Sequence, residues 1–180
     1  MRIISGKLKS VRFQPPKSFL SRPTTDFAKE ALFNVLGHRL SLYDLDVLDL
    51  FAGTGSISFE FASREVGRIT LVEQNFKCVR FIKEQAKKYN IEDDLTVVKG
   101  EVITFLQKNE NSYDIIFADP PFDFKKYDEI VDVVFQRELL DEGGLLIIEH
   151  SKRTDLSDLT GYDETKSYGG VSFSFFTNKD

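Results

Sequence analysis

The chain has 180 residues, of which 41% are hydrophobic, and it carries a net charge of -5. This length suits one domain that buries roughly 70% of the surface of its unfolded chain. No apolar run reaches the roughly 18 residues of a membrane-spanning helix, and the N-terminus lacks a secretory signal pattern. We therefore expect a soluble, cytoplasmic, monomeric protein with one domain over residues 1–180.

Cysteine and histidine are scarce. The lone Cys78 excludes an intramolecular disulfide, and His38 and His150 lie far apart in the sequence. Metal sites usually take several such ligands at close spacing, and a cysteine nucleophile needs a neighbouring base. We expect neither a metal site nor cysteine catalysis.

Positive charge is concentrated at the N-terminus. Residues 1–25 carry six basic side chains and no acidic one, whereas the rest of the chain carries 18 basic and 29 acidic side chains. Phosphate contacts need local positive potential rather than a positive net charge. The pattern fits a polyanion-binding arm and an ordinary basic terminus about equally. The candidate RNA-binding residues are Arg2, Lys7, Lys9 and Arg12.

Two short elements are predicted before the first strand. Apolar runs on either side of Ser5-Gly6-Lys7 predict a small β-hairpin with glycine in the turn. The stretch Arg22-Pro23-Thr24-Thr25-Asp26 predicts an extended connector that caps a helix over Asp26 to Leu36, which Gly37 ends. The expected buried stripe of this helix comprises Phe27, Ala28, Ala31, Leu32 and Val35.

An apolar run from Val47 ends in Gly53-Thr54-Gly55 and leads into a helical pattern. This order predicts a buried parallel strand that turns into a helix, and the glycines let the backbone approach a ligand closely. A dinucleotide site would have a third glycine where Ser58 stands, and no P-loop lysine follows. The loop therefore favours a nucleoside-type cofactor, with a plain tight turn as the alternative.

Acidic residues follow the next two predicted strands. The run Ile69 to Val72 ends in Glu73, which suits a ribose diol. After a helix over Asn75 to Tyr89, the strand Leu95 to Lys99 is followed by Glu101. That residue is placed equally well to contact an adenine amino group and to cap the following short helix.

The fourth predicted strand, Tyr113 to Ala118, delivers Asp119-Pro120-Pro121-Phe122. Two prolines stiffen the loop, the Asp119 carboxylate and the Pro120 carbonyl accept hydrogen bonds, and Phe122 offers a flat face. Such a loop suits a planar ring with an exocyclic amine, because stacking contributes about 1–3 kcal/mol per base. Aligning that amine with an activated methyl group contributes roughly 7–11 kcal/mol. The alternative is a stiff strand exit with a surface carboxylate.

The rest of the chain completes a parallel sheet that ends in an antiparallel pair. A helix over Asp128 to Leu140 and a turn over 141–144 precede a strand over Leu145 to Glu149. Two further strands, 162–168 and 171–177, flank a Gly169-Gly170 hairpin signal. Ligands of doubly wound sheets bind at the carboxyl ends of the strands, which places the four motif residues Gly53, Glu73, Glu101 and Asp119 on one rim.

The glycine loop together with Asp119-Pro120-Pro121-Phe122 resembles the class I methyltransferases that use S-adenosylmethionine to modify exocyclic amines. More narrowly, Arg22 to Asp26 followed by Lys29-Glu30-Ala31-Leu32-Phe33-Asn34 is similar to the RsmD-type 16S rRNA (guanine-N2)-methyltransferases. The resemblance covers essentially the whole chain. Two departures are Glu101, where aspartate is usual, and a short stretch after His150.

The resemblance implies a Rossmann-like α/β fold with a seven-stranded sheet of order 3-2-1-4-5-7-6 and an antiparallel seventh strand. It implies transfer of a methyl group from S-adenosylmethionine to the N2 amine of a guanine in 16S rRNA, within the small ribosomal subunit or its assembly intermediate. An adenine-N6 methyltransferase and a non-catalytic RNA-binding module are the alternatives. By position, the cofactor residues are Arg22, Thr24, Asp49, Phe51, Gly53, Thr54, Gly55, Glu73, Gln74, Glu101 and Asp119, and the catalytic loop is Asp119, Pro120, Pro121 and Phe122.

Overall fold

The computed structural model describes residues 1–16, 19 and 24–178. Among the residues described, none of the helices has the length and apolar composition needed to cross a membrane. The helices are α1 (Asp26–Arg39), α2 (Ser56–Ser63), α3 (Phe76–Lys88), the 3-10 turn η1 (Glu92–Asp94), α4 (Val102–Lys108) and α5 (Tyr127–Gln136). The strands are β1 (Asp46–Leu50), β2 (Arg68–Glu73), β3 (Leu95–Lys99), β4 (Tyr113–Ala118), β5 (Leu140–Ser151), β6 (Tyr162–Tyr168) and β7 (Val171–Thr177).

The seven strands form one sheet of order β3-β2-β1-β4-β5-β7-β6. Strands β1 to β5 pair in parallel, whereas β7 is antiparallel to both of its neighbours, β5 and β6. The predicted strand order and the antiparallel seventh strand are confirmed.

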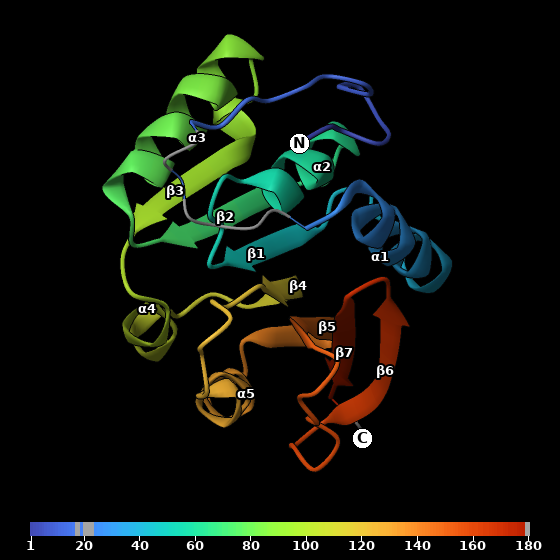
Figure 1. The fold of residues 1–180 in the computed structure, drawn as a ribbon. Coiled ribbons are helices and arrows are strands. Elements are labelled where there is room, and N and C mark those ends of the chain that lie inside the picture. The colour runs from blue at the N-terminus through green and yellow to red at the C-terminus, as the bar shows by residue number, and fades with distance from the viewer. Residues whose placement is uncertain (17–18, 20–23, 179–180) are drawn as a thin grey trace.

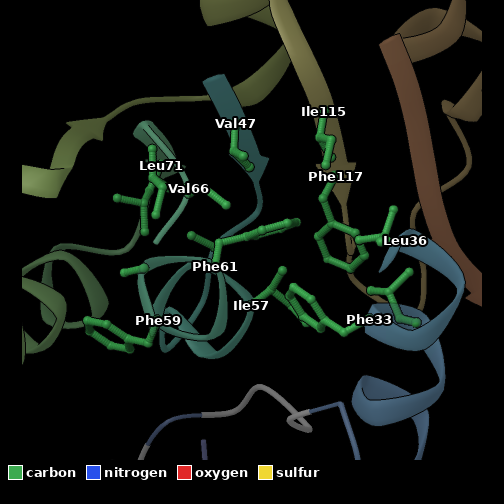
Figure 2. Close-up of a cluster of buried hydrophobic side chains, with 14 of the residues drawn as sticks. Phe33, Leu36, Val47, Ile57, Phe59, Phe61, Val66, Leu71, Ile115 and Phe117 are labelled. Carbon is green, nitrogen blue, oxygen red and sulfur yellow. The ribbon is translucent and has the colours of Figure 1, made fainter. Parts of the chain in front are cut away.

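Helices cover both faces of the sheet (Figure 1). Helices α1, α2 and α3 lie on one face with the N-terminal segment, and α4 and α5 lie on the other. Figure 2 shows the first face, where Phe33 and Leu36 of α1 meet Phe61 of α2 and Phe117 of β4. Burying a phenylalanine or leucine of this kind contributes about 1.5–3 kcal/mol. This packing holds the carboxyl ends of the strands in fixed positions.

The N-terminal segment is a hairpin that packs along α2. A single antiparallel bridge joins Arg2 to Arg12, and the buried Phe13 ring stacks on Phe59 with centroids 4.6 Å apart. At the turn, Gly6 has a φ of +85°, and a Cβ there would lie 1.8 Å from the Ser63 carbonyl oxygen. The predicted hairpin is confirmed, and its turn requires glycine at position 6.

A buried ion pair joins this hairpin to α1 and α2. Lys29 Nζ lies 3.4 Å from Glu60 Oε2 and donates to the Arg2 carbonyl at 2.6 Å. The Glu60 carboxylate also accepts the backbone N–H groups of Ile4 and Ser5 at 2.8 and 3.1 Å. Burial lowers the pKa of Lys29, and Glu60 opposes that shift. Three segments far apart in sequence therefore share one satisfied polar centre.

Helix α1 differs from its prediction in length and in the face that it buries. It continues through Gly37 to Arg39, because Gly37 does not take the left-handed backbone conformation with which a glycine ends a helix. Phe27 is 63% exposed, whereas Lys29 is fully buried. The buried face is rotated because Glu60 draws Lys29 inward. Its members are Ala28, Lys29, Leu32, Phe33 and Leu36.

The region between α5 and β5 also differs from its prediction. Helix α5 ends at Gln136 rather than at Leu140, because Glu138 adopts a left-handed φ of 53°. The predicted turn over 141–144 lies inside β5, where the pairing with β4 shifts register. Strand β5 is therefore longer than predicted at both ends, but its expected core, Leu145 to Glu149, is correct.

Candidate active site

The loop after β1 is held in left-handed backbone conformations. Phe51, Gly53 and Gly55 have φ values of 61°, 56° and 76°. A Cβ at Gly55 would lie 3.0 Å from the Phe59 ring. Glycine at position 55 is therefore favoured by both backbone angle and space, and the loop presents bare backbone at the carboxyl end of β1.

Glu73 fastens this loop to the end of β2. Its buried carboxylate accepts the Gly53 N–H at 2.8 Å and the Asn75 N–H at 2.7 Å. The following residue, Gln74, is exposed beside it. Glu73 thus lies where the sequence predicted it, at a strand tip against the glycine loop.

Asp49 is buried just below the loop, on β1. Its carboxylate accepts the Ser58 hydroxyl at 2.5 Å. Burial raises its pKa to about 7, against the opposing effect of the hydrogen bond from Ser58. Ser58 stands where a dinucleotide site would have its third glycine. In this protein its hydroxyl holds the Asp49 carboxylate in place.

The loop Asp119-Pro120-Pro121-Phe122 lies directly beside the glycine loop. Strands β1 and β4 pair with Leu50 opposite Ala118, and the Asp119 N–H donates to the Leu50 carbonyl at 3.3 Å. Farther along, the Phe51 ring meets Phe124 edge to face, with centroids 5.2 Å apart. The two predicted motifs therefore meet at one edge of the sheet.

Within the second loop, Pro120 is buried and Pro121 is exposed. Phe122 is 95% exposed, so its ring is available to a ligand. Asp119 is half-buried, and burial, followed by the charges of Glu149 and Asp49, raises the pKa of its carboxyl well above its usual range. The arrangement combines an acceptor at the strand end with a free aromatic face.

Glu149 is a site residue that the sequence reasoning missed. It follows Ile148, which pairs with Ala118, so it lies beside Asp119 on the neighbouring strand. The hydroxyl of Thr24 donates to Glu149 Oε2 at 2.9 Å. Burial raises the pKa of Glu149 to about 7, opposed by this hydrogen bond. The available signal was its place at the predicted end of the strand next to β4.

Two predicted cofactor residues have other observed surroundings. Glu101 accepts the N–H groups of Ile103 and Thr104 at 3.0 and 2.7 Å, so its carboxylate caps α4. The capping alternative is thus observed, and contact with an adenine stays a prediction. The Thr54 hydroxyl lies 3.3 Å from the sulfur of Met1. Arg22 lies outside the described residues.

The predicted RNA-binding residues lie at two ends of the hairpin. Arg2 and Arg12 line a hollow of about 320 Å³ with Met1 and Asp26, near the start of α1 and the glycine loop. Arg2 also pairs with Asp26 at 3.1 Å. The opposite end holds the two lysines: Lys9 lies in the Gly6 turn against Ser63, and Lys7 pairs with Asp94, just before β3 begins.

Metal-ligating side chains do not gather in this region. Over residues 1–16, 19 and 24–178, no group of three or more histidine, cysteine, aspartate or glutamate side chains is arranged to hold a metal ion. The acids of the site instead face one another and backbone donors.

The chain is similar over most of its length to known proteins. The family described as conserved hypothetical protein 95 matches residues 1–177. The ribosomal RNA small subunit methyltransferase D of Escherichia coli K12 is 31% identical over 153 residues, which cover 83% of this chain and 74% of that protein. Its namesake in Buchnera aphidicola subsp. Baizongia pistaciae is 32% identical over 149 residues, or 83% and 75% of the two chains.

Solved structures show the same architecture. A hypothetical protein of Thermus thermophilus is 28% identical, with a TM-score of 0.85 over 98% of this chain and 99% of that one. The precorrin-6y C5,15-methyltransferase of Geobacter metallireducens GS-15 is 21% identical, with a TM-score of 0.70 over 93% and 94% of the two chains, and shares the fold alone. This chain has the Rossmann-like fold of class I methyltransferases and belongs to the conserved hypothetical protein 95 family, the RsmD family of the sequence prediction.

Proposed function

We propose that the protein transfers a methyl group from S-adenosylmethionine to the exocyclic N2 amine of a guanine in 16S rRNA, within the small ribosomal subunit or its assembly intermediate. The observation that carries this proposal is the contact between the glycine loop and the Asp119 loop at one edge of the sheet. The names of the relatives support an rRNA substrate.

The glycine loop fits the cofactor. Gly53 and Gly55 take left-handed backbone angles, so the chain turns sharply after β1 and presents its backbone to a nucleoside and its amino-acid tail. Glu73 offers acceptor oxygens at the tip of β2 for ribose hydroxyls, while it holds Gly53 in place. When bound, S-adenosylmethionine supplies an electrophilic methyl group.

The Asp119 loop holds the amine. Asp119 and the Pro120 carbonyl accept the two amine protons, and the exposed Phe122 ring stacks on the base. This orientation turns the nitrogen lone pair toward the methyl group. The amine is a weak nucleophile because its lone pair is delocalised into the ring, so alignment supplies most of the rate gain. No strong base is needed, since the alkylated amine loses a proton readily to Asp119 or solvent.

Phosphates of the RNA bind at the near end of the hairpin. Arg2 and Arg12 are exposed around the hollow next to the site, so they are placed to hold the backbone beside a base that is splayed into the pocket. Lys7 and Lys9 lie at the far end and extend the positive surface to that side. The basic N-terminus therefore contacts RNA phosphates both next to the site and farther from it.

The test is transfer of a labelled methyl group to small subunits purified from cells that lack this protein, followed by nucleoside analysis of the rRNA. We expect label in N2-methylguanosine alone. Label in N6-methyladenosine would establish the adenine alternative. Binding of S-adenosylhomocysteine without any transfer to free rRNA or assembled subunits would instead support the non-catalytic module.

A further inference from the structure

Glu149 lies on the same face of the sheet as the catalytic Asp119. Successive side chains of a strand alternate between faces, and the paired residues Ala118 and Ile148 both belong to the core beneath α4 and α5. The next residue on each strand therefore points to the opposite face, toward α1 and α2. The two carboxyl groups project side by side from neighbouring strands, and the charge of Glu149 adds to burial in raising the pKa of Asp119.

The connector before α1 fixes the Glu149 carboxyl group. Thr24 donates its hydroxyl to Oε2 at 2.9 Å, and the next residue, Thr25, caps α1 by accepting the Ala28 N–H at 3.2 Å. Because the hydrogen bond fixes Oε2, the direction of Glu149 Oε1 is fixed as well. Glu149 thus has the pre-organisation that base discrimination requires.

The edge of a guanine offers two adjacent kinds of donor, the N2 amine and the N1–H group. Adenine carries an acceptor at N1 and no amine at C2. A carboxylate beside the N2-binding group would accept the guanine N1–H, whereas it would face a lone pair of adenine. Sites that hydrogen-bond a substrate group reject analogues that lack it by large factors, because a buried polar group of the site is left unpaired.

We propose that Glu149 is the base-specificity residue of this site and that its carboxylate accepts the N1–H of the target guanine while Asp119 accepts an N2 amine proton. This inference rests on the proposed function, which it deepens by assigning the choice of guanine to one side chain. The alternative is a purely structural role, in which Glu149 holds the connector before α1 in place through its hydrogen bond with Thr24.

The two interpretations differ for a base that keeps the amine and loses the N1 proton. The probe is 2-aminopurine, installed by splinted RNA ligation at the methylated position of 16S rRNA and assembled into small subunits. The wild-type protein should prefer guanine to 2-aminopurine by roughly 100-fold or more in kcat/KM. In Glu149→Gln, the amide can accept from guanine N1–H or donate to the bare N1, so the preference should fall at least about tenfold.

Three measurements make the result decisive. Glu142→Gln carries the same change at the exposed far end of β5 and should keep the wild-type preference. Thr24→Val removes the hydroxyl and keeps the carboxylate, so it should lower both rates and retain most of the preference. Thermal unfolding followed by circular dichroism checks that each variant folds, because Thr24 is itself a predicted cofactor residue; Glu149→Gln should fold because it removes like-charge repulsion with Asp119.

An unchanged guanine preference in a folded Glu149→Gln variant would overturn the inference and leave the proposed function intact. The inference would also be overturned if Glu149→Gln and Thr24→Val lowered kcat/KM equally and both kept the wild-type preference for guanine. Glu149 would then only hold the connector before α1. Absence of methyl transfer from the wild-type protein to guanine N2 would refute the proposed function itself, before any variant is compared.

Discussion

Two groups of buried or half-buried acidic side chains differ in whether a basic side chain pairs with them. Glu60 is matched by Lys29 and by backbone donors from the hairpin. Asp49, Asp119 and Glu149 lie near one another, and within the described part of the chain no lysine or arginine pairs with them. The matched group joins structural elements, whereas the unmatched group faces the loops proposed to bind ligands.

The difference indicates that Glu60 serves the stability of the fold, whereas the three unpaired acids serve the proposed site. A buried charge without a counter-charge destabilises the fold, and such groups with shifted pKa values concentrate at functional sites. The inference is stronger here because the unmatched acids lie at or near the carboxyl ends of three neighbouring strands, β1, β4 and β5, where α/β proteins bind ligands. If the comparison is correct, removing a charge should harm the matched group and relieve the unmatched one.

The largest effect should come from breaking the matched pair. Lys29→Met removes the fully buried cation from Glu60 and leaves Arg64, 3.0 Å from Glu60 Oε1, so we expect the free energy of unfolding to fall by up to roughly 3 kcal/mol. Urea denaturation measures the change. The double variant Lys29→Met with Glu60→Gln should recover part of the loss. A single variant as stable as wild type would show that the hairpin N–H groups and Arg64 suffice for Glu60.

Removing an acid of the unmatched group should have the opposite effect on stability. We expect Asp119→Ala to lower methyl transfer at least about 100-fold, because the amine loses a hydrogen-bond acceptor at this position. S-adenosylhomocysteine affinity should stay nearly unchanged, and the melting temperature should rise, because a desolvated acid is gone. Calorimetry and single-turnover transfer measure these three quantities. Joint loss of cofactor affinity and transfer would contradict the separate role of Asp119.

The pH dependence of stability should sharpen the comparison. In the native state Asp49 keeps its proton up to about pH 7, whereas its ordinary pKa is 3.8, so the native state binds the extra proton between these values. Stability is therefore lost as the pH rises through that window. Between pH 6 and pH 8 the wild type should lose about 1 kcal/mol more than Asp49→Asn. Parallel stability curves from urea titrations would rule out this burial effect.

The smallest effect concerns the hairpin, whose two ends lie at different distances from the site. Arg12→Gln should weaken binding to undermethylated small subunits about threefold and flatten the salt dependence, because one phosphate contact is lost. Lys9→Gln, an equal charge change at the far turn, should have a smaller effect. Filter binding over a salt series compares them. Equal slopes would indicate that both ends contact RNA alike.

The two motifs could be predicted because local signals determined them, whereas the strand order came from the resemblance to class I methyltransferases. An apolar run ending in Gly53-Thr54-Gly55 has few alternatives, and Asp119-Pro120-Pro121-Phe122 follows a strand that pairs beside it. The hairpin strands 162–168 and 171–177 were also correct. In each case the residues that decide the conformation are neighbours in sequence.

The predictions failed where residues far apart in sequence determine which side chains are buried or belong to the site. Lys29 belongs to the core because of Glu60, and no pattern within α1 carries that information. Glu149 was missed because its meaning depends on Asp119 of the adjacent strand and on Thr24, 125 positions away in sequence. From the sequence, Glu101 was compatible with both an adenine contact and a helix cap. Its hydrogen bond with the Ile103 N–H shows the cap.

The left-handed Phe51 joins the glycine loop to the segment that follows the Asp119 loop. A bulky residue in this conformation is strained by about 1–3 kcal/mol, and the contact of its ring with Phe124 helps to hold it there. A shift of either loop is thereby transmitted to the other through one pair of rings. If the two loops bind the nucleoside and the base as proposed, the two binding equilibria should be linked, and each ligand should change the affinity of the other by the same factor.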